Sequence, residues 1–134
     1  MSNVTLSPAD ETVIRTAAWG AVSLMSAAGI AGSAHKIGTE SSLALVAATG
    51  TVGRVVASAK GAKLKGKSTA ELADQVFPAI TESVKLLESR DPAEAQEFRN
   101  LIGIVVASAN RAHRGGPSPV MEDMARKIDE AMNA

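Results

Sequence analysis

The sequence predicts an all-α protein, a single bundle of about five helices with an alanine-rich core. Apolar residues make up 46% of the 134 residues and aromatic residues only 2%, so Ala, Val, Leu, Ile and Met must fill the interior. Several stretches begin with a helix-capping residue type and continue with apolar residues at helical spacing. No stretch reads as a ladder of alternating strand residues. A chain of this length fits one domain, which we expect to span residues 1–134.

Three of the expected helices begin with a capping residue followed by proline. The pairs are Ser7-Pro8, Asp91-Pro92 and Ser118-Pro119. The capping oxygen accepts a hydrogen bond from a backbone N–H of the first turn, and proline at the first helical position loses no hydrogen bond. Asp10 and Glu94 follow their caps by three residues, as in a capping box. Residues 68–71, Ser-Thr-Ala-Glu, form a further capping box and begin another helix.

Apolar periodicity and helix breakers set the expected bounds. The helices are expected at residues 8–28, 39–60, 69–89, from 92 to the Arg-Gly-Gly-Pro turn at 114–117, and from 119 through 132. Gly50 and Gly53 weaken the middle of the second helix, and Pro78 should kink the third. On the last helix, spacing predicts the ion pairs Glu122–Arg126 and Asp123–Lys127.

Charge and cysteine content exclude several classes of function. The chain has no cysteine, which excludes thiolate chemistry, disulfides and Cys-based zinc sites. Residues 1–67 carry a charge of +4 and residues 68–134 a charge of −4, so the whole chain is neutral. Nucleic-acid affinity depends mainly on neutralising phosphates, so we expect no nucleic-acid partner. We see no pattern of a secretory signal, and we expect the cytoplasm.

Residues 61–68 read G-A-K-L-K-G-K-S and match the P-loop pattern G-x-x-x-x-G-K-[ST]. In a P-loop the backbone N–H groups cradle phosphates, the lysine reaches the outer phosphates and the hydroxyl holds magnesium. That loop follows a strand of a parallel sheet, and no sheet is predicted here. The favoured interpretation is an inter-helix loop in which Ser68 caps the next helix. Nucleotide binding by the loop from Gly61 to Ser68 is an alternative.

A second alternative is association with a membrane surface. Residues 16–34 hold no charged residue and are long enough to span a bilayer. Their content is mostly Ala, Gly and Ser, and no flanking aromatic belt or charge cluster supports insertion. A helix buried among other helices is the interpretation we favour, and we expect no membrane partner.

Candidate catalytic and metal-ligating residues do not gather in the sequence. His35 and His113 each lie beside loop glycines, and the carboxylates lie mainly at caps and on exposed helix faces. We therefore expect no enzymatic activity, no catalytic residue, no cofactor and no metal.

The candidate contact surface is a cluster of lysines in the loop before residue 68. Its members are Lys60, Lys63, Lys65 and Lys67. This density of positive charge exceeds what solubility needs in a neutral chain, so its target should be acidic. An acidic partner protein, the acidic half of a second copy and an anionic ligand would each satisfy this expectation. A solvated linker is the alternative.

Several stretches spread over nearly the whole chain carry a family resemblance. They are residues 15–25 (RTAAWGAVSLM), 67–71 (KSTAE), 76–80 (VFPAI), 98–99 (FR) and 127–132 (KIDEAM). They resemble an uncharacterised family of small all-helical actinobacterial proteins. The resemblance implies a helical fold and does not imply any activity.

The turn at residues 113–122 (HRGGPSPVME) carries a more distant resemblance, to the tellurite-resistance TerB-like helical fold. In that fold an Ala-Asp-Gly turn precedes a Ser-capped helix with early Glu, and acidic turns bind metal. Here Arg114 stands at the Asp position. The resemblance therefore implies the fold and not the metal site, because a hard cation needs several oxygen ligands. We predict a non-catalytic helical interaction or structural module that binds an unknown protein partner or a second copy of itself.

Overall fold

The computed structural model describes residues 6–29, 34–58, 62, 64, 68–113 and 116–134. Within these residues all regular structure is helical, which confirms the all-α prediction. The helices are α1 (Pro8–Ala28), α2 (Ala34–Ala47), α3 (Gly50–Val56), α4 (Thr69–Arg90), α5 (Pro92–Ala112) and α6 (Pro119–Met132). None of them has the length and hydropathy that a membrane crossing requires.

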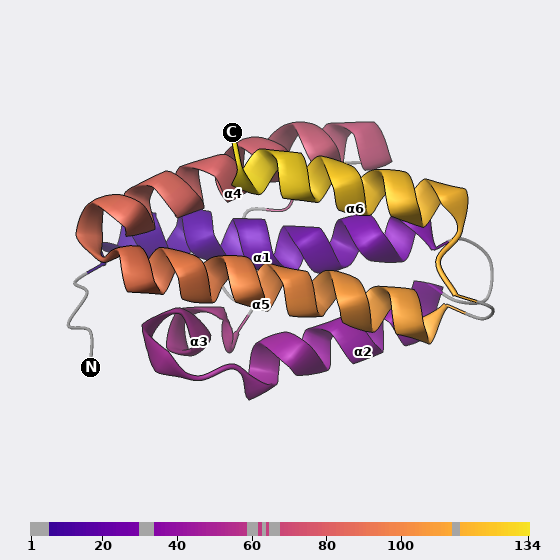
Figure 1. Cartoon of the computed structure of the whole chain (residues 1–134), viewed down its shortest axis with the longest axis horizontal. Helices are drawn as coiled ribbons and strands as arrows, with labels where there is room; N and C mark the ends of the chain where they lie inside the picture. The colour runs from indigo at the N-terminus through magenta and orange to yellow at the C-terminus, as the bar shows by residue number, and fades with distance from the viewer. Residues whose placement is uncertain (1–5, 30–33, 59–61, 63, 65–67, 114–115) are drawn as a thin grey trace.

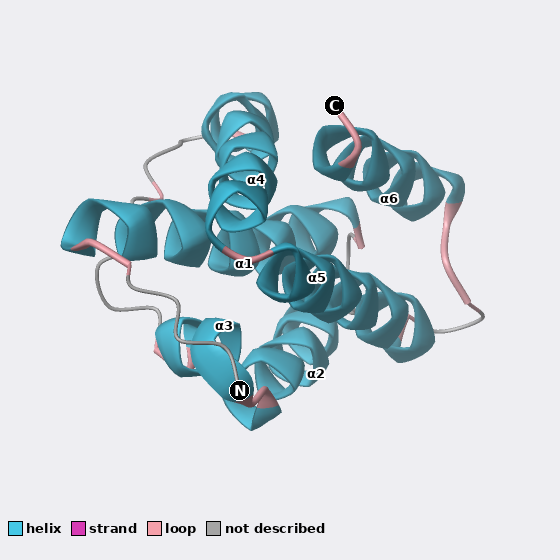
Figure 2. Cartoon of the chain, turned by 60° about the vertical axis from the view of Figure 1, so that its left-hand side comes forward, coloured by secondary structure: helices cyan, strands magenta, loops and turns pink. Residues whose placement is uncertain are grey.

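Helix α1 lies at the centre of the bundle and packs against each of the other five helices. Figure 1 shows α4 and α6 on one side of it and α2 and α3 on the other, with α5 across the front, and Figure 2 shows the same arrangement after rotation. Small side chains such as Ala17, Ala18 and Ala21 are completely buried on α1. A surface of alanines lets neighbouring helices approach closely, so a core almost without aromatic residues can still be densely packed.

The largest fully buried side chains come from every one of these helices. They are Ile14, Leu24, Met25, Leu45, Val52, Ile80, Leu87, Phe98, Ile102, Met121 and Ile128. On α4 the buried residues recur at three- and four-residue spacing, as the periodicity of its apolar residues predicts. The core is therefore one cluster to which all the helices contribute.

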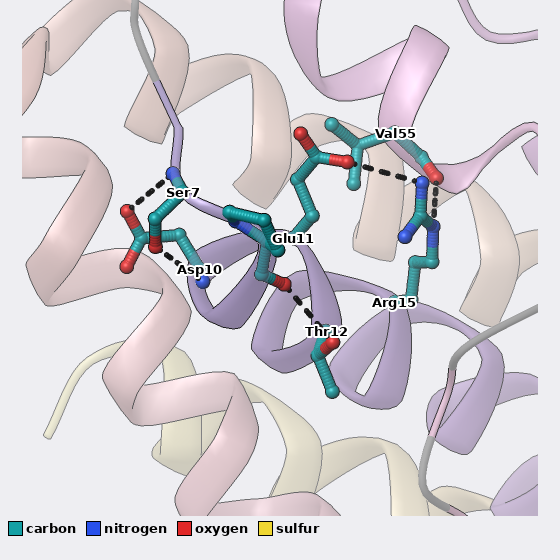
Figure 3. A network of polar contacts seen from close by, with 7 residues as sticks. Ser7, Asp10, Glu11, Thr12, Arg15 and Val55 are labelled. Carbon is teal, nitrogen blue, oxygen red and sulfur yellow. Dashed lines mark hydrogen bonds and ion pairs between the residues drawn. The ribbon is translucent and has the colours of Figure 1, made fainter.

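The helix starts confirm most of the capping predictions. Ser7 Oγ accepts from the Asp10 N–H at 3.1 Å, and the Asp10 carboxylate accepts from the Ser7 N–H at 3.0 Å, a complete capping box (Figure 3). The hydroxyls of Ser68 and Ser118 likewise accept backbone N–H bonds at the starts of α4 and α6. At Asp91 the carboxylate accepts from Ala93 N–H at 3.0 Å, one residue earlier than in a capping box.

The helix predicted over residues 39–60 is wrong in its bounds, because two helices occupy that part of the chain. Helix α2 begins earlier, at Ala34, and ends at Ala47, and α3 ends at Val56. The chain turns between them at Thr49, which is extended, and at Gly50, whose φ of +81° lies in the left-handed region. Gly53 allows α3 to fold back, since a β-carbon there would lie 2.5 Å from the carbonyl carbon of Ala48. The glycines permit a turn that larger residues would disfavour.

Two side chains of α1 hold the C-terminal end of α3. The indole N–H of Trp19 donates to the Val56 carbonyl at 3.0 Å, and Nε of Arg15 donates to the Val55 carbonyl at 2.8 Å. Arg15 also forms an ion pair with Glu11 at 3.2 Å, which orients its guanidinium (Figure 3). The last carbonyls of a helix have no partner within the helix, so these donors satisfy them and stabilise a helix too short to persist alone.

Helix α4 continues from Thr69 to Arg90 through Pro78. The side chain of Pro78 is exposed, on the side of α4 away from the core. The kink expected at this residue stays a prediction. Asp91 connects α4 to α5 as a single residue, being the C-terminal cap of one and the N-terminal cap of the other.

Candidate functional site: a groove between α4 and α6

The four lysines of the predicted contact surface, Lys60, Lys63, Lys65 and Lys67, lie outside the described residues. Their role as a contact surface therefore stays a prediction. The elements on either side of the loop are described: α3 precedes it and α4, capped by Ser68, follows it. A P-loop follows a strand, whereas the element before this loop is a helix.

Of the two histidines, His113 has a described side chain. The side chain of His35 lies outside the described part of the structure. His113 ends α5, is partly buried and has Nδ1 2.7 Å from the Gly116 carbonyl oxygen. Gly116 N–H donates back to the His113 carbonyl at 3.0 Å, and Gly116 has a φ of +89°. His113 thus closes the turn into α6.

An open groove of about 990 Å³ lies between α4 and α6. It is lined by Phe77, Pro78, Thr81, Glu82, Lys85 and Leu86 of α4 and by Lys127, Glu130 and Ala131 of α6. On α4 these residues recur every three to four positions and so share one helix face. The groove exists because this face of α4 and the adjoining face of α6 leave part of their apolar surface uncovered.

A hydrogen bond joins the two walls of the groove. The Thr81 hydroxyl donates to the carbonyl oxygen of Ala131 at 2.7 Å. Ala131 belongs to the last turn of α6, whose carbonyls have no partner within the helix. The bond therefore holds the end of α6 against the middle of α4.

The apolar floor and the charged rim of the groove are formed by different side chains. Phe77 and Leu86 are half-buried and pack against the core, and Pro78 is exposed. Glu82 and Lys85 are exposed on α4 and form no ion pair with any residue that the structure describes. The groove thus combines an apolar floor with two charges of opposite sign that are open to a ligand.

On α6 the rim charges already belong to an ion-pair network. Lys127 pairs with Asp123 at 3.1 Å, as predicted, while Arg126 pairs with Asp123 and, at 2.7 Å, with Glu130. The predicted Glu122–Arg126 pair is wrong, because Arg126 turns toward these two carboxylates instead. The hydrogen bonds that Lys127 and Arg126 donate to Asp123 lower the pKa of Asp123. The hydrogen bonds that Arg126 donates to Asp123 and Glu130 raise the pKa of Arg126.

A second, smaller hollow of about 330 Å³ lies where α2 and α3 meet α5. Its lining residues are Ala44, Ala47, Ala48, Thr49, Val52, Gly53, Glu97, Asn100, Leu101 and Ile104. Beside it stand exposed apolar side chains, among them Leu43 on α2 and Ile104 on α5.

Both hollows are lined by apolar side chains together with a few polar or charged ones. No group of three or more His, Asp or Glu side chains suited to a metal ion gathers anywhere in the described ranges. The groove supplies one aromatic ring, aliphatic side chains and fixed charges of both signs. Phe77 and Pro78 are adjacent in the sequence, but nothing in their pattern indicates a groove, because the facing wall comes from α6.

The chain matches no model of a protein family, no curated protein and no solved structure.

Proposed function

We propose that this chain is a non-catalytic interaction module that holds an amphipathic helix of a partner protein in the groove between α4 and α6. The observation that carries the proposal is the combination of an uncovered apolar floor with rim charges of both signs. The two resemblances noted in the sequence, including that to the TerB-like fold, stay predictions. We also infer a cytoplasmic location, because a chain without cysteine has no need of an oxidising compartment.

The shape of the groove favours a helix as its occupant. A helix binds in a groove by placing side chains of one face, spaced three and four residues apart, against an apolar floor. Phe77 and Leu86 lie nine positions apart on α4, a distance of about 13 Å at a rise of about 1.5 Å per residue. This length suits two to three turns of a bound helix.

The rim charges determine which charged residues the bound helix should carry beside its apolar face. Glu82 and Lys85 lie one turn apart and form no ion pair with the described residues, so a bound helix can pair with both. A helix with charges of one sign would meet repulsion from one of the two. The partner helix is therefore expected to carry a basic residue toward Glu82 and an acidic residue toward Lys85.

Selection from a displayed library of helical peptides tests this proposal. We expect enriched peptides to share an apolar seam flanked by one acidic and one basic position. Binding should be lost with Leu86→Glu, which places a charge in the groove floor. It should be kept with Ile104→Glu, a matched change on α5 outside the groove.

The charge requirement has its own test. When the same library is selected for binding to the Lys85→Glu variant, the enriched peptides should carry a basic residue at the position that was acidic before. The proposal would be overturned if the enriched peptides bound the Leu86→Glu variant with the same affinity as the unchanged protein. A selection that enriches no peptide would also overturn it.

Nucleotide binding and membrane-surface association are not favoured by any feature of the described residues. Calorimetric titration with ATP and magnesium tests the first, and flotation with anionic liposomes tests the second.

A further inference from the structure

One face of α5 carries a strip of exposed residues that faces solvent. Its members are Glu97, Asn100, Ile104, Ala107 and Arg111, and we refer to them as the α5 strip. Their spacing alternates between three and four residues, which places them along one side of the helix. Helix α5 lies across the front of the bundle, with α2 alongside it in both views (Figures 1 and 2). The strip is therefore open along its whole length in a single chain.

The middle of the α5 strip is uncharged, and Ile104 and Ala107 make part of it apolar. Ile104 has 52% of its surface exposed, and on α2 the side chain of Leu43 has 58% exposed. Ala47 of α2 and Ile104 line the same hollow, and Leu43 lies one turn from Ala47, so the apolar surface extends from α5 onto α2. Gly103, beside Ile104, has open space where a β-carbon would be, which leaves room for close approach of another helix.

The ends of the α5 strip carry opposite charges. Glu97 lies toward the start of α5 and Arg111 in its last turn, and Ile104 is seven residues from each. Neither charge forms an ion pair with any residue in the described part of the chain, and Arg111 makes only a long bond, 3.4 Å, to the Ser108 hydroxyl. Both charges are thus open to a partner in solution.

We propose that the α5 strip binds the α5 strip of a second copy of this chain, in a two-fold symmetric dimer with the two helices antiparallel about Ile104. In a two-fold interface each residue i meets residue j of the other copy while j meets i. Because Ile104 is the midpoint, the arrangement places Glu97 of each copy opposite Arg111 of the other. The uncharged centre can face its own copy without repulsion, which a patch of one sign of charge cannot do.

This inference goes beyond the proposed function, because it concerns a different surface and a different occupant. In Figures 1 and 2, α4 and α6 lie on the other side of α5 from α2, so the groove between them stays open in the proposed dimer. The dimer would present two grooves at once, and a partner with two helices would gain affinity from binding both.

Charge reversal at the two ends of the strip provides the test, read by sedimentation velocity. Glu97→Arg places arginine opposite Arg111, and Arg111→Glu places glutamate opposite Glu97. Each single change is expected to raise the dimer dissociation constant at least about tenfold, because each introduces like charges at both ends of the interface. The double variant Glu97→Arg/Arg111→Glu restores opposite charges and is expected to recover the dimer.

Mixing the two single variants gives a second readout of the same geometry. One copy then has two arginines and the other two glutamates at the ends of the strip, so a mixed dimer should form where neither variant dimerises alone. Glu82→Lys, a charge reversal in the groove between α4 and α6, is the control and should leave the dissociation constant unchanged. Circular dichroism of each variant checks that it is folded.

Three outcomes would overturn the inference. The first is a chain that stays monomeric at millimolar concentration. The second is a dimer that survives Ile104→Glu. The third is a double variant that dimerises no better than the two singles, since this would mean that Glu97 and Arg111 do not face each other.

Discussion

Gly20 on α1 lies so close to Val76 on α4 that a β-carbon at Gly20 would fall 2.4 Å from one γ-carbon of Val76. Both residues are buried, and α1 contacts every other helix of the bundle. The missing side chain at Gly20 therefore determines how closely the central helix and α4 approach.

Substitution Gly20→Ala is expected to destabilise the protein by about 1–3 kcal/mol, because a methyl group in this contact forces the two helices apart. The free energy of unfolding in urea measures the effect. Adding Val76→Ala should recover part of the loss, since the smaller side chain makes room for the new methyl group, and the two changes should be non-additive.

Gly103→Ala is the matched control, also a glycine inside a helix. Nothing lies within 4 Å of the position of its β-carbon. Alanine there is expected to stabilise the protein by about 0.5–1 kcal/mol, because it restricts the unfolded chain without strain. Equal effects of the two substitutions would show that the contact with Val76 is not what governs Gly20.

Ser83→Ala is expected to raise the free energy of unfolding by about 1 kcal/mol. Ser83 on α4 is completely buried, and its hydroxyl finds no hydrogen-bond partner among the described residues. Removing a buried polar group without a partner removes its desolvation cost. Ser108→Ala is the comparison, since the Ser108 hydroxyl accepts from Arg111 at 3.4 Å. A loss of stability in Ser83→Ala would show that this hydroxyl has a partner in solution.

Thr81→Val is expected to destabilise the protein by about 1 kcal/mol, the usual net value of one hydrogen bond. The substitution keeps the shape of the side chain but removes the donor that the Ala131 carbonyl accepts at 2.7 Å. Hydrogen exchange should also speed up in the last turn of α6 and leave the first turn unchanged. Thr12→Val, which removes a bond to Pro8 within α1, serves as the control and should not alter exchange in α6.

The stability of the protein is expected to fall in acid partly through Asp10. The backbone N–H of Ser7 lowers the pKa of Asp10 most, the Ser7 hydroxyl and Arg90 lower it further, and burial opposes them. The folded protein thus holds this proton less tightly than the unfolded chain does. The stabilisation is complete above the ordinary aspartate pKa of about 3.9 and is lost as pH falls through the lower pKa of the folded state.

Asp10→Asn isolates this contribution, because asparagine keeps the shape and cannot titrate. The difference in free energy of unfolding between the protein and the variant should be constant near neutral pH and shrink below about pH 4. A difference that does not vary with pH would mean that the pKa of Asp10 is the same in the folded and unfolded chains.

The sequence was sufficient to predict the helices whose starts are encoded locally. Ser7, Ser68, Asp91 and Ser118 each cap the helix that follows, and those helices begin at the predicted residues. A cap and the turn it closes lie within four residues of each other, so neighbouring residues alone specify the start.

The break between α2 and α3 could not be predicted in this way. Gly50 and Gly53 indicated a weak point in the predicted helix, but the sign of φ at Gly50 depends on where the chain must turn. Donors from α1 then satisfy the end of α3 at Val55 and Val56, about 40 residues away along the chain. The groove could not be predicted for the same reason, because its walls come from α4 and α6, which meet only after the bundle has formed.

The bond between Trp19 and Val56 gives the protein an internal optical reporter. Trp19 is the one tryptophan in the sequence, so the indole fluorescence of the chain arises at the junction of α1 with α3. If α3 separates while the other helices stay packed, the emission maximum will shift to longer wavelength as water reaches the ring, with little change in circular dichroism. Light emitted by this one side chain therefore distinguishes the release of α3 from unfolding of the whole bundle.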